Sequence, residues 1–348
     1  MRAIIITLII LLLLVIFFAI IPIFIKRPSS VSTATKASTL YESTDRGVSW
    51  QGIDEFPGGE VTKIIFDKND ANVVIVGTQL AGLWRGNLRD HKWEQYRDEL
   101  GGAAKILDII EPAASNDLIA LTFSEKRGHV MRFLNGDVRE LLFAPLDNFA
   151  FFKGRFGAGG AIEIIGSDGG LYRSSDGGAH WETLSRFRDG LTLFEINPAN
   201  DSEIWAINSK GALFHSRSDG AVWEDLSNGL GAFSKAYDTK TIYFDPGSGA
   251  LYHGSSFGLL VSYDHGASWN QVPLIAPPES LPVTSIAVDP KSSSKLFVGA
   301  QNQLYISNDS GQSWVGKQIP GIGVISSIAI NPKDSKIILI GLEAASRI

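Results

Sequence analysis

Most of the chain alternates short apolar runs with turn residues. Residues 283–289 (Val-Thr-Ser-Ile-Ala-Val-Asp) and 295–299 (Lys-Leu-Phe-Val-Gly) are two such runs, and Asp289-Pro290 begins the turn between them. Asp or Asn followed by Pro is favoured at the first positions of a β-turn. The same kind of pair recurs at three other places: Asn197-Pro198, Asp245-Pro246 and Asn331-Pro332. These runs predict short antiparallel strands joined in hairpins.

A segment of eight residues that ends in tryptophan follows several of these hairpins. Ser43–Trp50 reads Ser-Thr-Asp-Arg-Gly-Val-Ser-Trp. Three further good copies are Ser174–Trp181, Ser262–Trp269 and Ser307–Trp314. Two copies are weaker: Ser216–Trp223 has Ser218 at the aspartate position, and Gly86–Trp93 keeps only the tryptophan. The tryptophans recur about every 44 residues, with one double interval. Val130–Leu141, a predicted hairpin with Asn135-Gly136 at its turn, lies inside that interval.

Each period has room for four short strands, which is the size of one propeller blade. Residues 326–348 supply two strands and stop before a further tryptophan segment would begin, whereas Leu40 begins a region with only the two outer strands. We therefore expect the two ends to complete one blade together. The fold predicted for residues 39–348 is an all-β, seven-bladed β-propeller of four-stranded blades, closed by N- and C-terminal strands.

The N-terminal region has a different pattern. Residues 3–25 are apolar except for Thr7 and Pro22, and about 20 apolar residues span a bilayer as a helix. A cleaved signal peptide is the alternative, but its apolar region is shorter, so the pattern favours an uncleaved anchor. We assign residues 1–28 to an N-terminal transmembrane anchor and residues 29–38 to a flexible linker. The flanking charges are nearly balanced, and the short N-terminal tail favours a signal anchor with the propeller outside the cytoplasm.

Composition and charge exclude several kinds of chemistry. Lys and Arg total 31 against 37 Asp and Glu, and the basic residues are scattered, so we expect no nucleic-acid partner. The chain has no cysteine, which excludes disulfides, zinc thiolate sites and thiol nucleophiles. The six histidines, which show no paired metal-ligand spacing, are His91, His129, His180, His215, His253 and His265. The sequence therefore predicts no metal site and no cofactor.

The repeated Ser-x-Asp-x-Gly-x-Ser/Thr-Trp segment resembles the Asp box, or bacterial neuraminidase repeat. Sialidases, sortilin-type receptors, xyloglucanase-type glycosidases and photosystem II assembly factor propellers carry this repeat, and the resemblance covers about residues 39–348. The box is a turn device whose carboxylate accepts backbone hydrogen bonds across the loop. We predict this structural role for four residues: Asp45, Asp176, Asp264 and Asp309.

The resemblance does not extend to a catalytic apparatus. The Arg-Ile-Pro signature of sialidases is absent, and the chain is too short for the two propellers of xyloglucanase-type enzymes. We predict no catalytic residue and favour a membrane-anchored, non-catalytic binding or assembly scaffold for a protein or glycan ligand. The alternative is a carbohydrate-active enzyme, a sialidase-like or xyloglucanase-like glycoside hydrolase. Such an enzyme needs two carboxylates, and Glu125, Asp168 and Glu343 fall on equivalent loops.

The candidate binding face is the one opposite the boxes. In a four-stranded meander, the second-to-third loops and the connections between blades emerge together, away from the first-to-second turns and the boxes. The candidate residues are Gln79, Lys126, Arg127, Asp168, Lys210 and Gln301 from the loops, and Arg97, Arg186, Arg188 and Lys317 from the connections. As a set they predict a basic rim suited to an acidic peptide, a carboxylate-bearing glycan or a phosphate.

Overall fold

The computed structural model describes residues 38–96, 104–112, 117–134 and 137–344. The predicted membrane anchor at residues 3–25, the predicted hairpin turn Asn135-Gly136 and the candidate residue Arg97 lie outside these ranges. Within them, no helix has the length and apolar character needed to cross a membrane.

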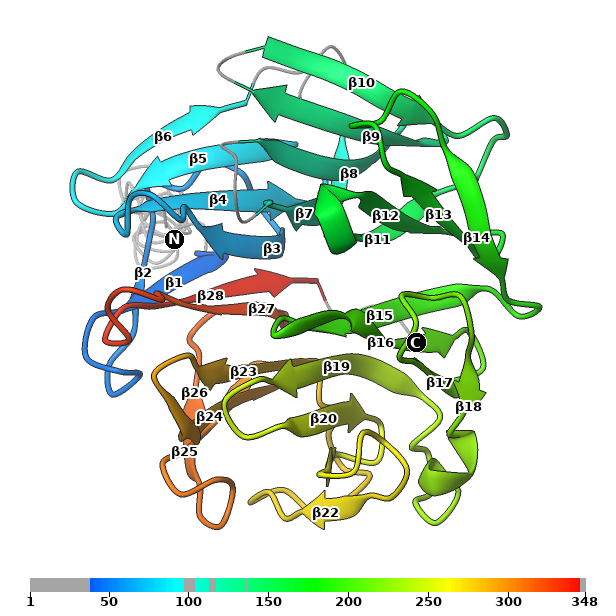
Figure 1. Ribbon diagram of the computed structural model, residues 1–348. Coiled ribbons are helices and arrows are strands. Elements are labelled where there is room, and N and C mark those ends of the chain that lie inside the picture. Colours follow the sequence, from blue (N-terminus) through cyan, green and yellow to red (C-terminus); the bar gives the residue numbers. More distant parts are fainter. Residues whose placement is uncertain (1–37, 97–103, 113–116, 135–136, 345–348) are drawn as a thin grey trace, which may run out of the picture. The chain divides into compact units, whose positions relative to one another are not determined.

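The described residues form seven antiparallel sheets of four strands, arranged as the blades of a propeller (Figure 1). Blade 1 contains β3 (Val61–Phe66), β4 (Val73–Thr78), β5 (Leu83–Asn87) and β6 (Lys92–Gln95). Blade 2 contains β7 (Lys105–Ile110), β8 (Leu118–Ser124), β9 (Arg127–Leu134) and β10 (Asp137–Phe143). Blade 3 contains β11 (Phe151–Phe156), β12 (Ile162–Gly166), β13 (Gly170–Ser174) and β14 (Glu182–Arg186).

The remaining blades repeat this order. Blade 4 contains β15 (Leu191–Asn197), β16 (Asn200–Asn208), β17 (Leu213–Ser216) and β18 (Glu224–Asp225). Blade 5 contains β19 (Thr239–Asp245), β20 (Ala250–Ser255), β21 (Leu259–Ser262) and β22 (Asn270–Val272). Blade 6 contains β23 (Ser285–Asp289), β24 (Ser292–Ala300), β25 (Gln303–Ser307) and β26 (Val315–Gln318). Two short 3₁₀ helices are η1 (Ala158–Gly160) and η2 (Ser227–Leu230).

Blade 7 joins the two ends of the propeller. It contains β27 (Val324–Ile330), β28 (Ile338–Glu343), β1 (Leu40–Ser43) and β2 (Gln51–Gly52). β28 pairs antiparallel with β1, so that Tyr41 lies opposite Ile340. The prediction of seven four-stranded blades closed by strands from both ends is confirmed. Because the closing contact is a β-ladder, the ring has no open sheet edge between its first and last segments.

The first strand of each blade lies at the centre of the ring. These strands contact one another in order, from β27 beside β3 and β3 beside β7 to β23 beside β27. Several carry a bulge near the start, as between Val61 and Lys63 in β3 and between Phe151 and Lys153 in β11. A bulge re-aims the side chains beside it. Lys63 and Lys153 follow such bulges, and both line the central cavity described below.

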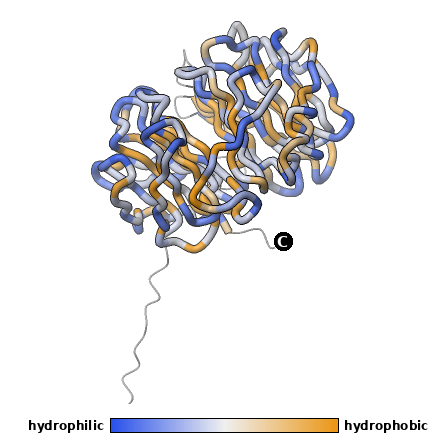
Figure 2. The backbone as a smooth tube through the Cα atoms, turned by 90° about the horizontal axis from the view of Figure 1, so that it is seen from below, coloured by the Kyte–Doolittle hydropathy of each residue, from blue (hydrophilic) through white to orange (hydrophobic). Residues whose placement is uncertain are grey.

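Apolar side chains pack between the blades. Every residue of β4 and of β20 is buried, as expected for strands covered on both faces. Figure 2 shows apolar residues concentrated in the strands and polar residues in the loops. Neighbouring blades approach closely at glycine, since a Cβ at Gly341 of β28 would lie 2.3 Å from Val61 Cγ1 of β3. Glycine at this position therefore lets blade 7 pack against blade 1.

The propeller has two faces that differ in their loops. The turns between first and second strands lie on one face, here called the turn face. The box loops, which also lie on the turn face, are residues 43–50, 174–181, 216–223, 262–269 and 307–314. The second-to-third loops and the blade connections lie on the other face, here called the loop face. Backbone hydrogen bonds join a second-to-third loop to the neighbouring blade connection, such as Ser167 N to Ala150 O at 2.9 Å and Ser209 N to Gly190 O at 3.0 Å.

Candidate functional site

The box aspartates are hydrogen-bonded within their own loops. Asp45 accepts bonds from Ser43 Oγ at 2.8 Å and from Ser49 N at 2.9 Å. The indole N–H of Trp50 donates to the carbonyl of Gly47 at 3.2 Å. Hydrogen bonds, above all those from Ser49, lower the pKa of Asp45 to about 2. The other aspartates with the serine and backbone bonds of this pattern are Asp176, Asp264 and Asp309. Each carboxylate is engaged in its own turn.

A network of ion pairs links the box loop of blade 4 to blade 3. Arg155 Nε donates to Glu163 Oε2 at 2.6 Å, and Arg155 Nη2 lies 2.7 Å from Asp219 Oδ1. Arg173 also pairs with both of these carboxylates. Glu163 and Arg155 are buried, so their charges are compensated within the network. This cluster joins two blades and uses all of its charged groups in doing so.

The central channel contains a cavity of about 640 Å³ that opens toward the turn face. Its lining comes from the first strands of blades 1 to 4 and from the turns that follow them. Asp108 lies between two lysines, 3.5 Å from Lys63 Nζ and 3.6 Å from Lys153 Nζ. Asp108 Oδ2 also accepts a hydrogen bond from Gly154 N at 3.1 Å. The wall of the cavity therefore combines apolar side chains with groups of both charge signs.

The acidic groups of this cavity differ in their ionisation. Burial opposes ionisation of Asp108, but the charges of Lys153 and Lys63 outweigh it and lower the pKa of Asp108. Burial raises the pKa of Glu195 to about 7. Burial and the nearby charge of Asp67 raise the pKa of Glu111 to about 7. The cavity lining thus includes one ionised carboxylate and two whose pKa values lie near neutral pH.

The predicted binding residues lie on the loop face, apart from Arg97, which is outside the described residues. The second-to-third loops carry Gln79, Lys126, Asp168, Lys210 and Gln301. Arg127 begins β9, Arg186 ends β14, Arg188 lies in the β14–β15 connection, and Lys317 lies in β26.

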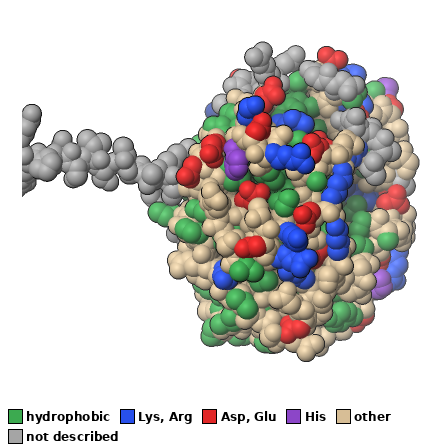
Figure 3. All heavy atoms as spheres, turned by 90° about the vertical axis from the view of Figure 1, so that its left-hand side faces the viewer, with side chains coloured by type: hydrophobic (Ala, Val, Ile, Leu, Met, Phe, Trp, Pro, Cys, Tyr) green, Lys and Arg blue, Asp and Glu red, His purple; other side chains and the backbone are tan. Residues whose placement is uncertain are grey.

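Three of these basic residues are paired with acids of the same face. Arg127 Nε lies 3.0 Å from Asp147 Oδ1, Lys210 Nζ lies 2.7 Å from Asp189 Oδ1, and Arg186 pairs with Asp168. Their positive charges are therefore compensated, and they do not form a continuous basic rim. Figure 3 looks onto the opposite side of the ring, the turn face, where Lys and Arg are also interspersed with Asp and Glu.

The three carboxylates from which the alternative, a glycoside hydrolase, would draw its pair lie in different blades. Glu125 is exposed in the β8–β9 turn, and burial raises the pKa of Glu343 at the end of β28. Asp168, in the β12–β13 turn, accepts a hydrogen bond from Tyr172 Oη at 2.6 Å. Burial opposes ionisation of Asp168, but its bonds to Tyr172, Gly170 and Arg186 lower its pKa. Asp168 is therefore unsuited to act as a general acid.

Two histidines that are far apart in the sequence meet at one carboxylate. The ligand atoms of Glu203, His215 and His265 all lie within 4.8 Å of one another. The cluster is not visible in the sequence, because its residues come from two blades and follow no ligand spacing along the chain. The blade repeat is the one signal that would have found it, since it places β17 beside the next box loop.

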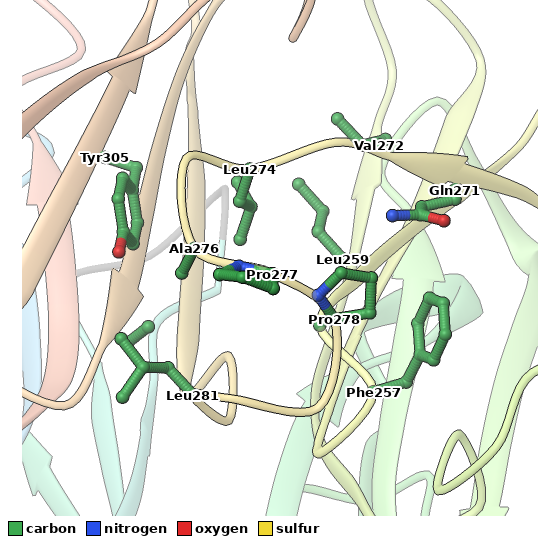
Figure 4. A pocket seen from close by; sticks show the side chains of 12 residues that line it. Phe257, Leu259, Gln271, Val272, Leu274, Ala276, Pro277, Pro278, Leu281 and Tyr305 are labelled. Carbon is green, nitrogen blue, oxygen red and sulfur yellow. The ribbon is translucent and has the colours of Figure 1, made fainter.

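A narrow apolar groove lies between blades 5 and 6 on the loop face (Figure 4). Its free volume is only about 10 Å³, which is room for about one water molecule. The side chains that fill it include Phe257, Leu274, Pro277, Leu281 and Tyr305. The groove is part of the packing between blades and does not accommodate a ligand in this conformation.

Comparison with known proteins identifies the fold. No protein-family model and no curated protein matches the sequence. The structure of the GH74 xyloglucanase from Xanthomonas campestris matches with a TM-score of 0.68 at 17% identity, over 82% of this chain and 51% of that one. YCF48 bound to D1 peptide matches with a TM-score of 0.64 at 16% identity, over 83% of this chain and 95% of that one.

YCF48 from Cyanidioschyzon merolae matches with a TM-score of 0.65 at 13% identity, over 82% of this chain and 97% of that one. The chain thus spans about half the length of the xyloglucanase and nearly the whole of each YCF48 chain. The chain is a seven-bladed β-propeller, similar in fold to YCF48 and to the propeller of the xyloglucanase.

Proposed function

We propose that this chain is a non-catalytic scaffold, held on a membrane by residues 3–25, that binds a partner protein on its loop face. The observation that carries this proposal is a set of large apolar side chains that project from the loop face. They are between 40% exposed (Tyr237) and 88% exposed (Ile322), and among the described residues of the blade connections and second-to-third loops they are Leu80, Leu146, Tyr237, Ile275 and Ile322. An exposed patch of apolar side chains with a polar surround is typical of protein-binding surfaces.

Two cations on the same face complement these apolar groups. Lys126 and Arg188 are exposed, and neither forms an ion pair within the part of the chain that the structure describes. Uncompensated cations beside apolar groups favour a partner segment that carries both apolar and acidic side chains. YCF48 bound to D1 peptide supports the binding of a protein segment by a propeller of this size.

The test removes apolar contacts from one face at a time. Leu80→Ser with Ile322→Ser changes the loop face, and Val48→Ser with Val222→Ser changes box loops whose side chains are similarly exposed. Both double variants should keep the melting temperature, because none of the four side chains is buried. We expect chemical cross-linking in native membranes to recover the partner with the box-loop variant and to lose it with the loop-face variant. Equal recovery with both variants would contradict the proposal.

A second function is favoured by the central cavity. Glycoside hydrolysis requires one protonated and one ionised carboxyl group, and the lining of the cavity includes Glu111 and Glu195, with pKa values of about 7, and the ionised Asp108. If the chain is a hydrolase, a screen of polysaccharides should show cleavage that Glu195→Gln or Glu111→Gln abolishes. No cleavage by the folded wild-type chain leaves the binding scaffold as the function.

A further inference from the structure

We infer that Glu203, His215 and His265 form a binding site for a divalent transition-metal ion of the zinc type, at the junction of blades 4 and 5. Glu203 lies on β16 and His215 on β17, which are neighbouring strands of blade 4. His265 comes from the box loop between β21 and β22 of blade 5. An ion held by all three side chains would connect the two blades directly.

The distances fit ligands of one ion. His215 Nε2 lies 3.0 Å from Glu203 Oε1, and His265 Nδ1 lies 2.8 Å from the same oxygen. Two ligands about 2.1 Å from a zinc ion, at a tetrahedral angle, are themselves about 3.4 Å apart. A small outward movement of the histidines therefore makes room for the ion. Two imidazoles and a carboxylate suit Zn²⁺, whereas Ca²⁺ and Mg²⁺ prefer oxygen ligands throughout.

The direction of the His265 ring supports an ion between the groups. Nδ1 of His265 is shielded from solvent and makes no hydrogen bond within the described structure, although Glu203 Oε1 is only 2.8 Å away. The two atoms are close but misaligned for a hydrogen bond. In a metal site the nitrogen lone pair points at the ion and not at the neighbouring ligand, so this misalignment is the arrangement that coordination requires.

The surrounding groups hold the three ligands in place. Asn197 Nδ2 donates to the second carboxylate oxygen of Glu203 at 2.9 Å, which orients the first oxygen toward the histidines. Trp205 lies parallel to His215 with ring centroids 5.1 Å apart, and its Nε1 donates to the carbonyl of His265 at 2.8 Å. One amide and one indole thus position all three side chains, as second-shell groups do in metal sites.

The site is accessible from one side. Glu203 and His215 are buried, whereas the His265 side chain is 45% exposed. An ion can enter past His265, and water can complete its coordination there, as in sites with three protein ligands. Because the ligands come from two blades, an ion bound only by the folded chain must raise the stability of this junction.

The test is titration of the full-length, tag-free chain with ZnCl₂ by isothermal calorimetry. We expect one saturable Zn²⁺ per chain, with the affinity at least about tenfold lower for His265→Asn and for Glu203→Gln. Asparagine suits residue 265, whose φ is 61°, because it tolerates the left-handed conformation. If Glu203→Gln does not fold, His265→Asn still tests the site, because its side chain lies partly in solvent.

His180→Asn is the matched control. His180 also lies in a box loop, 2.6 Å from the carboxylate of Asp176, but no second histidine joins this pair in the described structure. His180→Asn should bind Zn²⁺ as the wild type does, and Zn²⁺ should raise the melting temperature of both but not that of His265→Asn. The inference is overturned if the wild type shows no saturable binding, or if His265→Asn and Glu203→Gln bind Zn²⁺ as tightly as His180→Asn.

Discussion

Replacing Ile340 by alanine tests whether the closing blade is a packed part of the ring. Ile340 is fully buried at the centre of β28, opposite Tyr41 on β1 and Ile328 on β27. The substitution removes three carbons, which forfeits about 2.4 kcal/mol of burial at about 0.8 kcal/mol per methylene. The cavity that remains between the strands raises the expected loss of unfolding free energy to about 3 to 4 kcal/mol.

Urea unfolding, followed by tryptophan fluorescence, measures this loss. The midpoint should fall while the slope of free energy against urea stays constant, because the folded and unfolded surfaces hardly change. Ile275→Ala is the matched control, since Ile275 is 61% exposed and its loss should cost less than about 0.5 kcal/mol. If Ile340→Ala were as mild as Ile275→Ala, the packing of β28 would not hold the ring closed.

Three further outcomes are expected. A chain that ends at Gly323 lacks β27 and β28, so its exposed strand edges should cause aggregation, which size-exclusion chromatography detects. A soluble truncated chain that melts cooperatively would contradict closure of the ring by these strands. Glu163→Gln removes one of the negative charges that compensate the buried Arg155, so the free energy of unfolding in urea should fall by about 3 kcal/mol. A fall of less than about 1 kcal/mol would show that the network is not buried. Burial lowers the pKa of His253 to about 4, below the value of 6.5 in the unfolded chain. Between these two pH values the unfolded chain binds the proton and the folded chain does not, so the free energy of unfolding should rise with pH. The rise should be shallower for His253→Gln, and identical pH profiles would refute this reasoning.

The fold can be predicted from the sequence because its information is repeated. A hairpin such as residues 283–299 is ambiguous by itself, but the tryptophan segments impose one period on the whole chain. Blade 2 lacks that segment, yet the predicted hairpin Val130–Leu141 lies within its strands β9 and β10, which extend three residues further at the start and two at the end. Blade 7, which both ends of the propeller share, could be counted because the N-terminal end supplies only two strands, β1 and β2, and the C-terminal end supplies the other two, β27 and β28.

The sites were harder to predict because they depend on contacts between blades. The sequence shows that Arg127, Arg186 and Lys210 belong to loops of one face, but not that each has an acidic partner there. The same limit applies to the channel, where Asp108 meets two lysines from neighbouring blades. Such pairings depend on the rotation of one blade against the next, which no spacing within a single repeat records.

The central claim, that a partner protein docks on the loop face, is tested most directly by site-specific photo-cross-linking. A photoreactive phenylalanine analogue is placed at Leu80 or Ile322 on the loop face, and at Val48 or Val222 in the box loops, where exposure is similar. After irradiation of native membranes, we predict one discrete cross-linked species from each loop-face position and none from the box loops. A cross-link from Val48 or Val222 with none from Leu80 or Ile322 would contradict the account.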